Sequence, residues 1–329
     1  MNMKYFKDNI PTLIDAKNID ESPGPFTMSF GFNLKPLIRS IEKFGLINIP
    51  YVLKDNSEKW VPVMGYRRIL ALKSLQWKEI PCVDLSGVGI PVLDLILLNL
   101  HDNLITRKFN DVEKGMILNG LIPHVTRDEI LRHYMPLLGL PSHESTLDLF
   151  LKLEKLDTSL KNSVAEGTIS LRACKQILRM NHESSMIILS WLKKIKFNLN
   201  QQLKFIEYME DISIKEEKSI TQILDEKQLL KLLENKNLNN PQKAKHVLNH
   251  LRYRCFPRLM KSEKTFKKNI SRLSLPKDVT IQHPPYFETP YYLLEILFKN
   301  GKELKEKIDF LSHLDELNSL EDPWEKEFS

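Results

Sequence analysis

The chain has 329 residues, of which 42% are hydrophobic and 27% charged, and these proportions exclude an intrinsically disordered protein. Its 48 lysines and arginines only slightly exceed its 42 acidic residues, so any nucleic-acid contact depends on where the +6 net charge is concentrated. The length predicts more than one domain, and the low glycine content, 11 residues, predicts a helix-rich chain.

Three widely spaced cysteines predict a reduced protein without a disulfide framework. The most apolar stretch, residues 89–100, contains Pro91 and Asp94 and is shorter than the roughly 18 residues that a membrane helix requires. The amino-terminal residues lack the apolar core of a signal peptide. We therefore expect a cytoplasmic protein without membrane contact.

The first hundred residues alternate between helical and strand patterns. Helices are predicted at 34–44, 66–75 and 92–101, and strands at 49–53, 60–64 and 80–84. Gly45 is expected to end the first helix, and Pro62, which cannot donate to a strand ladder, places its strand at a sheet edge. This alternation predicts a small α+β or α/β domain.

The junction Gly65-Tyr66-Arg67-Arg68 joins a predicted strand to a predicted helix. A glycine there lets backbone approach a ligand, and the free N–H groups of the first helical turn attract anions. Two arginines in the first turn oppose the helix dipole, but they are well suited to bind phosphates. A solvated arginine pair on an amphipathic helix is the alternative that these residues alone leave open.

Beyond Arg107 the patterns are almost entirely helical. Helices are predicted at 110–121, 127–138, 142–156, 158–166 and 171–180, then further helices to about 234 and a last one from about 291. Asn110, Ser142 and Ser170 are the expected caps. The break at Gly139-Leu140-Pro141 between two helices is typical of a helix-turn-helix.

Residues 243–272 contain ten lysines and arginines against a single acid, Glu263. Such a stretch favours contact with nucleic-acid phosphates, for which we single out Arg252, Arg254 and Arg258. A solvated basic face is the alternative. An acidic tail, which contains Glu321, Asp322, Glu325 and Glu327, could pair with this stretch and compete for DNA.

Four segments, in their order and spacing, resemble the ParB/sulfiredoxin-like domain of ParB partition proteins. They are residues 37–50, the Gly65–Arg68 junction, residues 75–83 and residues 101–113, and the resemblance covers residues 23–115. The family domain is a CTP switch. The resemblance therefore implies a nucleotide site formed by Gly65, Tyr66, Arg67, Arg68, Asp102, Asn103 and Arg107, with Asp102 and Asn103 near Mg²⁺.

Three positions depart from the family pattern. Tyr66 stands where the family has a glutamate tied to hydrolysis, which favours CTP binding and leaves CTP hydrolysis open. Thr27-Met28-Ser29 replaces a motif with a basic residue, and Arg107 lies one place later than the family arginine.

The helical middle resembles the helix-turn-helix domain of ParB and KorB proteins. This resemblance implies a reading helix that begins near His143 and contacts DNA through His143, Ser145, Thr146 and Lys152. Two acids, Glu144 and Asp148, lie at its start and are poor neighbours for phosphates. A helical bundle that keeps only the topology is the alternative.

These features together predict a mostly α-helical protein with three parts. An α+β domain at 1–108 binds nucleotide, an all-α helix-turn-helix domain at 109–182 binds DNA, and a helical region follows at 183–329. The expected function is CTP-regulated DNA binding in partition or transcriptional regulation, by a homodimer that works with a ParA-type ATPase. The alternatives are a DNA regulator or adaptor without nucleotide, and a nuclease or phosphotransferase that uses Asp102, Asp111 and Glu113.

Overall fold

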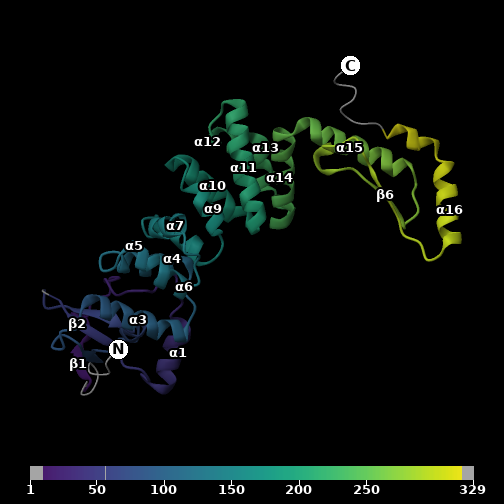
Figure 1. Cartoon of the computed structure of the whole chain (residues 1–329). Helices are drawn as coiled ribbons and strands as arrows, with labels where there is room; N and C mark the ends of the chain where they lie inside the picture. Colours follow the sequence, from purple (N-terminus) through teal and green to yellow (C-terminus); the bar gives the residue numbers. More distant parts are fainter. Residues whose placement is uncertain (1–9, 56, 321–329) are drawn as a thin grey trace. The chain divides into compact units, whose positions relative to one another are not determined.

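The computed structural model describes residues 10–55 and 57–320, and the chain divides into two compact units, Met1–Asn181 and His182–Ser329. Helices predominate, as predicted, and each unit contains one small sheet (Figure 1). The finer division at residue 108 stays a prediction. Over the described residues, no helix combines the length and apolarity that crossing a bilayer would require.

The first unit contains a mixed four-stranded sheet. Its strands are β1 (Thr12–Asp15), β4 (Glu79–Asp84), β2 (Tyr51–Lys54) and β3 (Trp60–Met64), in that spatial order. β4 pairs antiparallel with β1 and parallel with β2, and β2 pairs antiparallel with β3. The edge position predicted for the strand containing Pro62 is confirmed, whereas β1 was not predicted.

Three helices accompany this sheet: α1 (Lys35–Phe44), α2 (Tyr66–Ser74) and α3 (Val92–Thr106). α1 ends as predicted at Gly45, whose φ of 73° is unfavourable for residues with a side chain. The core between α1, α2 and the strands contains Ile14, Ile41, Val52, Ile69, Leu72, Ile80 and Cys82.

The remainder of the first unit is helical. It comprises α4 (Asp111–Leu121), α5 (Arg127–Glu129), a π-helical turn (Ile130–Tyr134), α6 (Met135–Leu137), α7 (Glu144–Glu154), α8 (Thr158–Ala165) and α9 (Leu171–Ile177). Asn110 and Ser170 cap their helices as predicted. The predicted cap Ser142 is wrong, because α7 follows His143 and has no side-chain cap.

α4 packs directly against α7 at Gly115. A Cβ atom at this position would lie 2.6 Å from the carbonyl oxygen of Phe150, so only glycine allows the two helices to approach this closely. Leu147, Phe150 and Leu153 of α7 are buried. The opposite face of α7 is therefore left for solvent or a partner.

The second unit begins with five helices: α10 (His182–Ile195), α11 (Leu199–Glu216), α12 (Ile220–Leu224), α13 (Lys227–Glu234) and α14 (Asn240–Cys255). Phe205 of α11 stacks between Trp191 and Phe197 at the centre of this group. A long helix, α15 (Pro257–Arg272), follows at once after Phe256.

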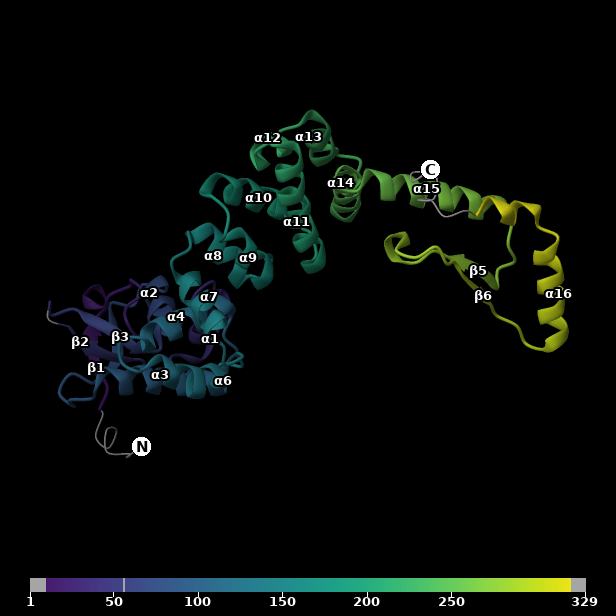
Figure 2. The ribbon, with the colours of Figure 1, turned by 45° about the horizontal axis from the view of Figure 1, so that its top comes forward.

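The last part of the chain differs from the prediction. A helix was expected from about 291, but Leu293–Ile296 forms strand β6, which pairs antiparallel with β5 (Val279–Gln282), as Figure 2 shows. The last long helix, α16 (Gly301–Ser312), begins only after the cap Asn300. The prediction of a helix from about 291 was wrong because a short apolar run has no periodicity that separates strand from helix.

A candidate nucleotide cavity and nucleic-acid surfaces

A cavity of about 190 Å³ opens beside the first turn of α2. All seven residues predicted to bind nucleotide line it: Gly65, Tyr66, Arg67, Arg68, Asp102, Asn103 and Arg107. Met28, Ser29 and Thr106, which occupy the positions that depart from the family motifs, line it as well. The structure thus brings together residues from α2, α3 and the loop before α1.

Gly65 forms the turn into α2 with a left-handed backbone, φ 82° and ψ 23°. A Cβ atom here would lie 3.0 Å from Cβ of Pro50, so both conformation and space favour glycine. No side chain caps α2, and the N–H group of Arg68 donates to the carbonyl oxygen of Gly65 at 2.8 Å, so the N–H groups of Tyr66 and Arg67 are the ones left for a ligand.

The carboxylate of Glu113 connects the elements around the cavity. Its side chain is 2% exposed, and it receives hydrogen bonds from Arg67 Nη2 at 2.6 Å and from Arg107 Nη1 at 2.7 and 2.8 Å. The backbone N–H groups of Phe30 and Asn110 donate to it as well. Glu113 therefore ties α2, the end of α3 and the loop at Phe30 to the start of α4.

The sequence contained a signal for part of this arrangement. Asn110 followed three residues later by Glu113 forms a capping box, in which each side chain accepts from the other residue's N–H. The contacts with the two arginines are long-range and have no such signature. Glu113, considered above only as a carboxylate of a hypothetical enzyme, is instead enclosed by guanidinium groups.

Both arginines have further contacts. Arg67 donates to Ser29 Oγ at 3.0 Å and lies over the ring of Phe32. Arg107 donates to Asn103 Oδ1 at 2.7 Å and to the carbonyl oxygen of Met28 at 2.5 Å. Asn103 is thereby held in place by Arg107, and its amide oxygen is already engaged.

The electrostatics leave positive charge at the cavity. Burial lowers the pKa of Arg67, the charge of Arg107 lowers it further, and Glu113 opposes both effects. Two guanidinium groups share one carboxylate, so one positive charge is uncompensated within this cluster. Arg68 adds another, since its side chain makes no ion pair with any described residue.

The remaining polar groups have distinct roles. The hydroxyl of Tyr66 donates to the carbonyl oxygen of Glu21 at 2.8 Å, and burial together with Asp20 and Glu21 raises its pKa. Asp102 is the only carboxylate among the described residues that line the cavity. No group of three or more acids, histidines or cysteines suited to a metal occurs in the described chain.

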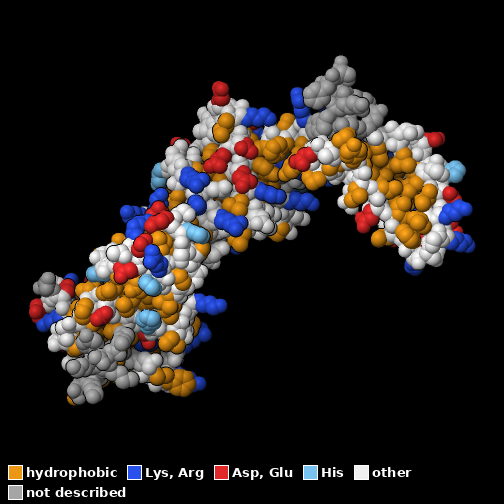
Figure 3. All heavy atoms as spheres, in the orientation of Figure 1, with side chains coloured by type: hydrophobic (Ala, Val, Ile, Leu, Met, Phe, Trp, Pro, Cys, Tyr) orange, Lys and Arg blue, Asp and Glu red, His pale blue; other side chains and the backbone are white. Residues whose placement is uncertain are grey.

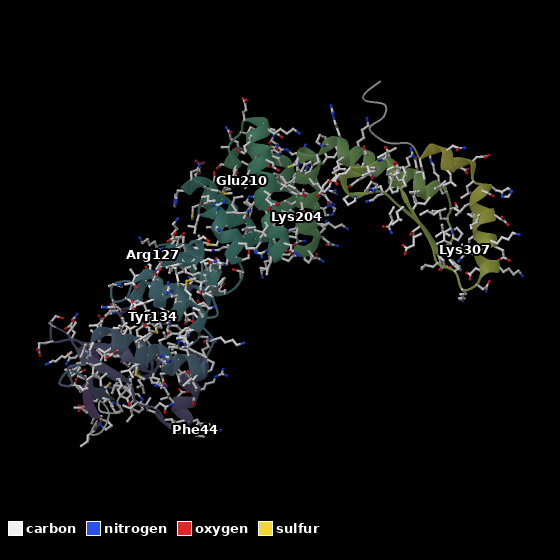
Figure 4. All side chains as sticks on the ribbon, viewed as in Figure 1. Phe44, Arg127, Tyr134, Lys204, Glu210 and Lys307 are labelled. Atoms are coloured by element: carbon white, nitrogen blue, oxygen red, sulfur yellow. The ribbon has the colours of Figure 1, made fainter. Side chains whose placement is uncertain are left out.

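The predicted reading helix lies on the surface of the first unit as α7. His143, Ser145 and Lys152 are exposed and Thr146 is half-buried. Arg127 of α5, labelled in Figure 4, donates to Glu144 and Asp148, in each case at 2.6 Å. The two acids at the start of α7 therefore share a counter-ion that the sequence did not reveal.

The arginines singled out in the basic stretch are engaged within the second unit. Arg252 pairs with Glu263 at 2.5 Å, and Arg254, 14% exposed, pairs with Glu216 and Glu226. The hydrogen bond from Arg254 is the main reason that the pKa of Glu216 falls to about 2. Arg258 also has an interaction partner. The predicted DNA contacts of these three side chains stay a prediction.

The chain is similar in sequence to several curated chromosome-partitioning and nucleoid occlusion proteins. It is 27% identical over 210 residues to a probable chromosome-partitioning protein ParB of Campylobacter jejuni, across 61% of this chain and 70% of that protein. It is 28% identical over 193 residues to the corresponding protein of Chlamydia muridarum and 23% identical over 180 residues to a nucleoid occlusion protein of Bacillus cereus. The last two matches span 64% and 59% of those proteins and 54% of this chain. These relatives are named for chromosome partitioning and for nucleoid occlusion.

By sequence the chain is a divergent ParB-like protein. No family model matches it. Two structures of C-terminally truncated Caulobacter crescentus ParB, one complexed with CTP-gamma-S and one with the centromeric parS site, align at 15% and 12% identity. They cover 55% and 58% of this chain and 92% and 96% of the ParB chains. Their TM-scores of 0.26 and 0.31 are too low to support an argument about fold or site.

Proposed function

We propose that the protein is a ParB-like DNA-binding protein of partition or transcriptional regulation whose first unit binds a ribonucleoside triphosphate, CTP by resemblance. The observation that carries the nucleotide proposal is the meeting of all seven candidate residues in one cavity beside an uncapped helix start. Its charge surplus and free N–H groups suit a polyphosphate.

The residues present fit a triphosphate with Mg²⁺. Arg68 and the first turn of α2 would hold phosphate oxygens, and Asp102 would supply one carboxylate to the cation. Mg²⁺ commonly takes one or two carboxylates, phosphate oxygens and water, so a single acid is sufficient. The magnesium role proposed for Asn103 is weaker, because its oxygen already accepts from Arg107.

A second cavity, of about 240 Å³, adjoins the first. The two share Leu37 and Arg68, and the second is completed by Ile41, Leu46 and Asn48 among others. Apolar walls with a few polar groups are typical of sites for a ring-shaped ligand. We place the base there and the phosphates beside Gly65, with Arg68 between them.

Isothermal titration calorimetry with the four ribonucleoside triphosphates, with and without Mg²⁺, tests this proposal. Arg68→Ala should weaken binding at least roughly tenfold, since a charge-assisted hydrogen bond contributes about 1.5–3 kcal/mol. Arg39→Ala, which removes an exposed arginine of α1 outside both cavities, is the control and should bind as the unmodified protein does. Absence of affinity for every triphosphate in the unmodified protein would remove the nucleotide proposal.

For DNA we propose the exposed side of α7 as the reading surface. His143, Ser145 and Lys152 are accessible there, and the side chains on the opposite side pack against α4. A fluorescence anisotropy titration with candidate operator duplexes tests this. Loss of sequence preference in Ser145→Ala and Thr146→Ala, with folding unchanged, is the expected result.

A homodimer is proposed through the end of the second unit. Figure 3 shows hydrophobic side chains gathered over β6 and α16. Leu293 of β6, and Leu297 and Phe298 directly after this strand, are at least half exposed, and a two-stranded sheet is marginal by itself. Leu293→Asp with Leu297→Asp should produce a monomer in light scattering, whereas Ile214→Asp, at an exposed site of α11, should not. The ParA-type ATPase stays a prediction.

One observation favours a second candidate function, a DNA-binding regulator without nucleotide. The carboxylate of Glu113 already forms ion pairs with the guanidinium groups of Arg67 and Arg107, which a phosphate would otherwise bind. Retained DNA affinity that no triphosphate alters would select this candidate.

A further inference from the structure

An apolar groove lies in the second unit, between the C-terminal end of α15 and strand β5. We call it the α15–β5 groove, and its volume is about 430 Å³. It is lined by the apolar side chains of Ile270, Leu275, Val279 and Ile281 and by hydroxyl-bearing residues that include Ser271 and Thr280. None of the described residues that line it is charged. A volume above roughly 300 Å³ with such walls is typical of a site for an apolar or aromatic group.

Positively charged side chains flank the α15–β5 groove. Lys267 lies four residues before Ser271 and therefore one turn away on the same side of α15. Arg272 adjoins Ser271 in sequence, and Lys277 lies two residues before Val279. All three cations are exposed, and none forms an ion pair with a described residue. The groove is thus an apolar surface at the edge of unbalanced positive charge.

The acids nearest to the groove already have other partners. Asp278 pairs with Lys307 at 3.3 Å, and Glu295 accepts a hydrogen bond from Thr280 Oγ1 at 3.5 Å. Glu263, the one acid of α15, pairs with Arg252. The cations beside the groove therefore have no counter-ion in the described part of the chain. A ligand that suits this surface is aromatic and acidic at the same time.

One segment of the chain has this chemistry. Residues 321–329 contain four acids, one lysine and two aromatic residues, Trp324 and Phe328. The pairing predicted above between this acidic tail and the basic stretch falls on these residues, which lie outside the described part of the chain. Their composition complements both the apolar walls and the flanking cations of the α15–β5 groove.

The tail is attached close to the groove. It follows η5 (Asp315–Ser319), which contacts α15. Trp324 is five residues beyond Ser319 and can thus lie up to roughly 17 Å from it, a distance of about three turns of α15. Attachment at this distance raises the local concentration of the segment, so weak contacts are sufficient to hold it.

We propose that the α15–β5 groove binds the acidic tail of the same chain. The indole of Trp324 occupies the groove, and the acids around it pair with Lys267, Arg272 and Lys277. Exposed ion pairs contribute little, so burial of the aromatic ring supplies most of the binding energy. Any other partner of this surface then has to displace the tail. The proposal involves no residue of the nucleotide cavity or of α7.

Fluorine NMR of the full chain labelled with 5-fluorotryptophan tests the proposal. The measurement contains neither DNA nor nucleotide, so its outcome is independent of the functions proposed above. Trp324→Phe and Trp77→Phe identify the signals of the tail and of a reference indole that is 37% exposed. The shift between H₂O and D₂O, which reports solvent exposure, should be smaller for Trp324 than for Trp77. A shift equal to or larger than that of Trp77 would overturn the proposal.

A charge placed in the groove tests where the tail binds. Ser271→Glu adds a carboxylate at an exposed lining position, which should repel the acids of the tail and lower the ratio of bound to free tail at least about threefold. Asn237→Glu adds the same charge at an exposed site before α14 and should leave the Trp324 signal unchanged. Equal effects of the two variants would overturn the groove as the binding site. Circular dichroism confirms that each variant is folded.

The flanking cations are tested in the same way. Lys267→Gln with Lys277→Gln should lower the ratio of bound to free tail several-fold, since each removes an exposed ion pair. Lys302→Gln with Lys305→Gln, at exposed sites of α16, has the same net charge and should have no effect. The absence of a difference between these pairs would contradict the proposal. Protection of Trp324 that disappears on dilution would overturn it in favour of the groove of a second copy.

Discussion

Each unit of the protein contains a cluster in which arginine meets glutamate, and the two clusters are composed differently. In the first unit, Arg67 and Arg107 share the single carboxylate of Glu113. In the second, Arg254 and Lys218 together face Glu216 and Glu226. The first cluster keeps a positive charge beside a cavity, whereas the second is balanced. A count of basic residues along a sequence does not reveal this difference, because the carboxylates come from distant positions.

The largest expected effect follows from removing the shared charge in the first cluster. Glu113→Gln keeps the shape of the side chain but leaves two partly buried guanidinium groups without an anion, which should cost about 3 kcal/mol of unfolding free energy. Urea unfolding measures it. Glu42→Gln, at an exposed site of α1, is the control and should leave the unfolding free energy almost unchanged.

The Glu113→Gln variant also tests whether a phosphate can take the place of the carboxylate in the first cluster. If phosphate replaces the lost carboxylate, pyrophosphate or CTP should raise the melting temperature of Glu113→Gln more than that of the unmodified protein. An equal effect on both proteins would show that the arginines do not receive the ligand in place of Glu113.

Mutation of the balanced cluster in the second unit should lower stability less than Glu113→Gln does, and the loss should depend on pH. The hydrogen bond from Arg254 lowers the pKa of Glu216 from its usual 4.5 to about 2. A lowered acid pKa stabilises the folded state above the unfolded pKa, and that contribution is lost as pH falls from 4.5 through about 2. Arg254→Ala should therefore lower stability by about 1–2 kcal/mol at neutral pH.

The difference in unfolding free energy between the unmodified protein and Arg254→Ala should become smaller as pH falls from 4.5 towards 2. Unfolding at several pH values measures it, and Arg252→Ala, which lacks any contact with Glu216, supplies a reference. If this difference in unfolding free energy stays constant down to pH 2, Arg254 stabilises the fold through packing and not through its ion pair with Glu216.

Local signals in the sequence predicted much of this structure. The helix that ends at Gly45, the edge strand with Pro62 and the cap Asn110 each depend on residues within a few positions. What the sequence did not reveal depends on distant partners. β1 pairs with residues more than sixty positions away, and β6 was mistaken for a helix because its partner β5 lies across a proline-containing connector.

The candidate site divides in the same way. The family resemblance identified residues that the fold brings to one cavity, because it preserves order and spacing along the chain. It did not identify which arginines are already paired, since the contacts of Glu113 with Phe30 and Arg67 span 83 and 46 positions. Charge neutralisation is a property of the folded chain, and only the structure separates the engaged Arg254 from the exposed Lys264.

The smallest effect on stability, and the sharpest test of this distinction, is expected at Arg127. Its side chain is 44% exposed and its pairs with Glu144 and Asp148 lie in solvent, so Arg127→Ala should change stability by less than about 1 kcal/mol. DNA affinity should nevertheless fall several-fold, because the two carboxylates at the start of α7 would face phosphates without their counter-ion. Arg132→Ala, which removes an arginine that is 75% exposed and paired with Asp128, is the control of equal charge change for anisotropy titrations. Equal losses in the two variants would show that Arg127 contributes only its net charge, whereas a loss confined to Arg127→Ala would show that it shields the reading helix.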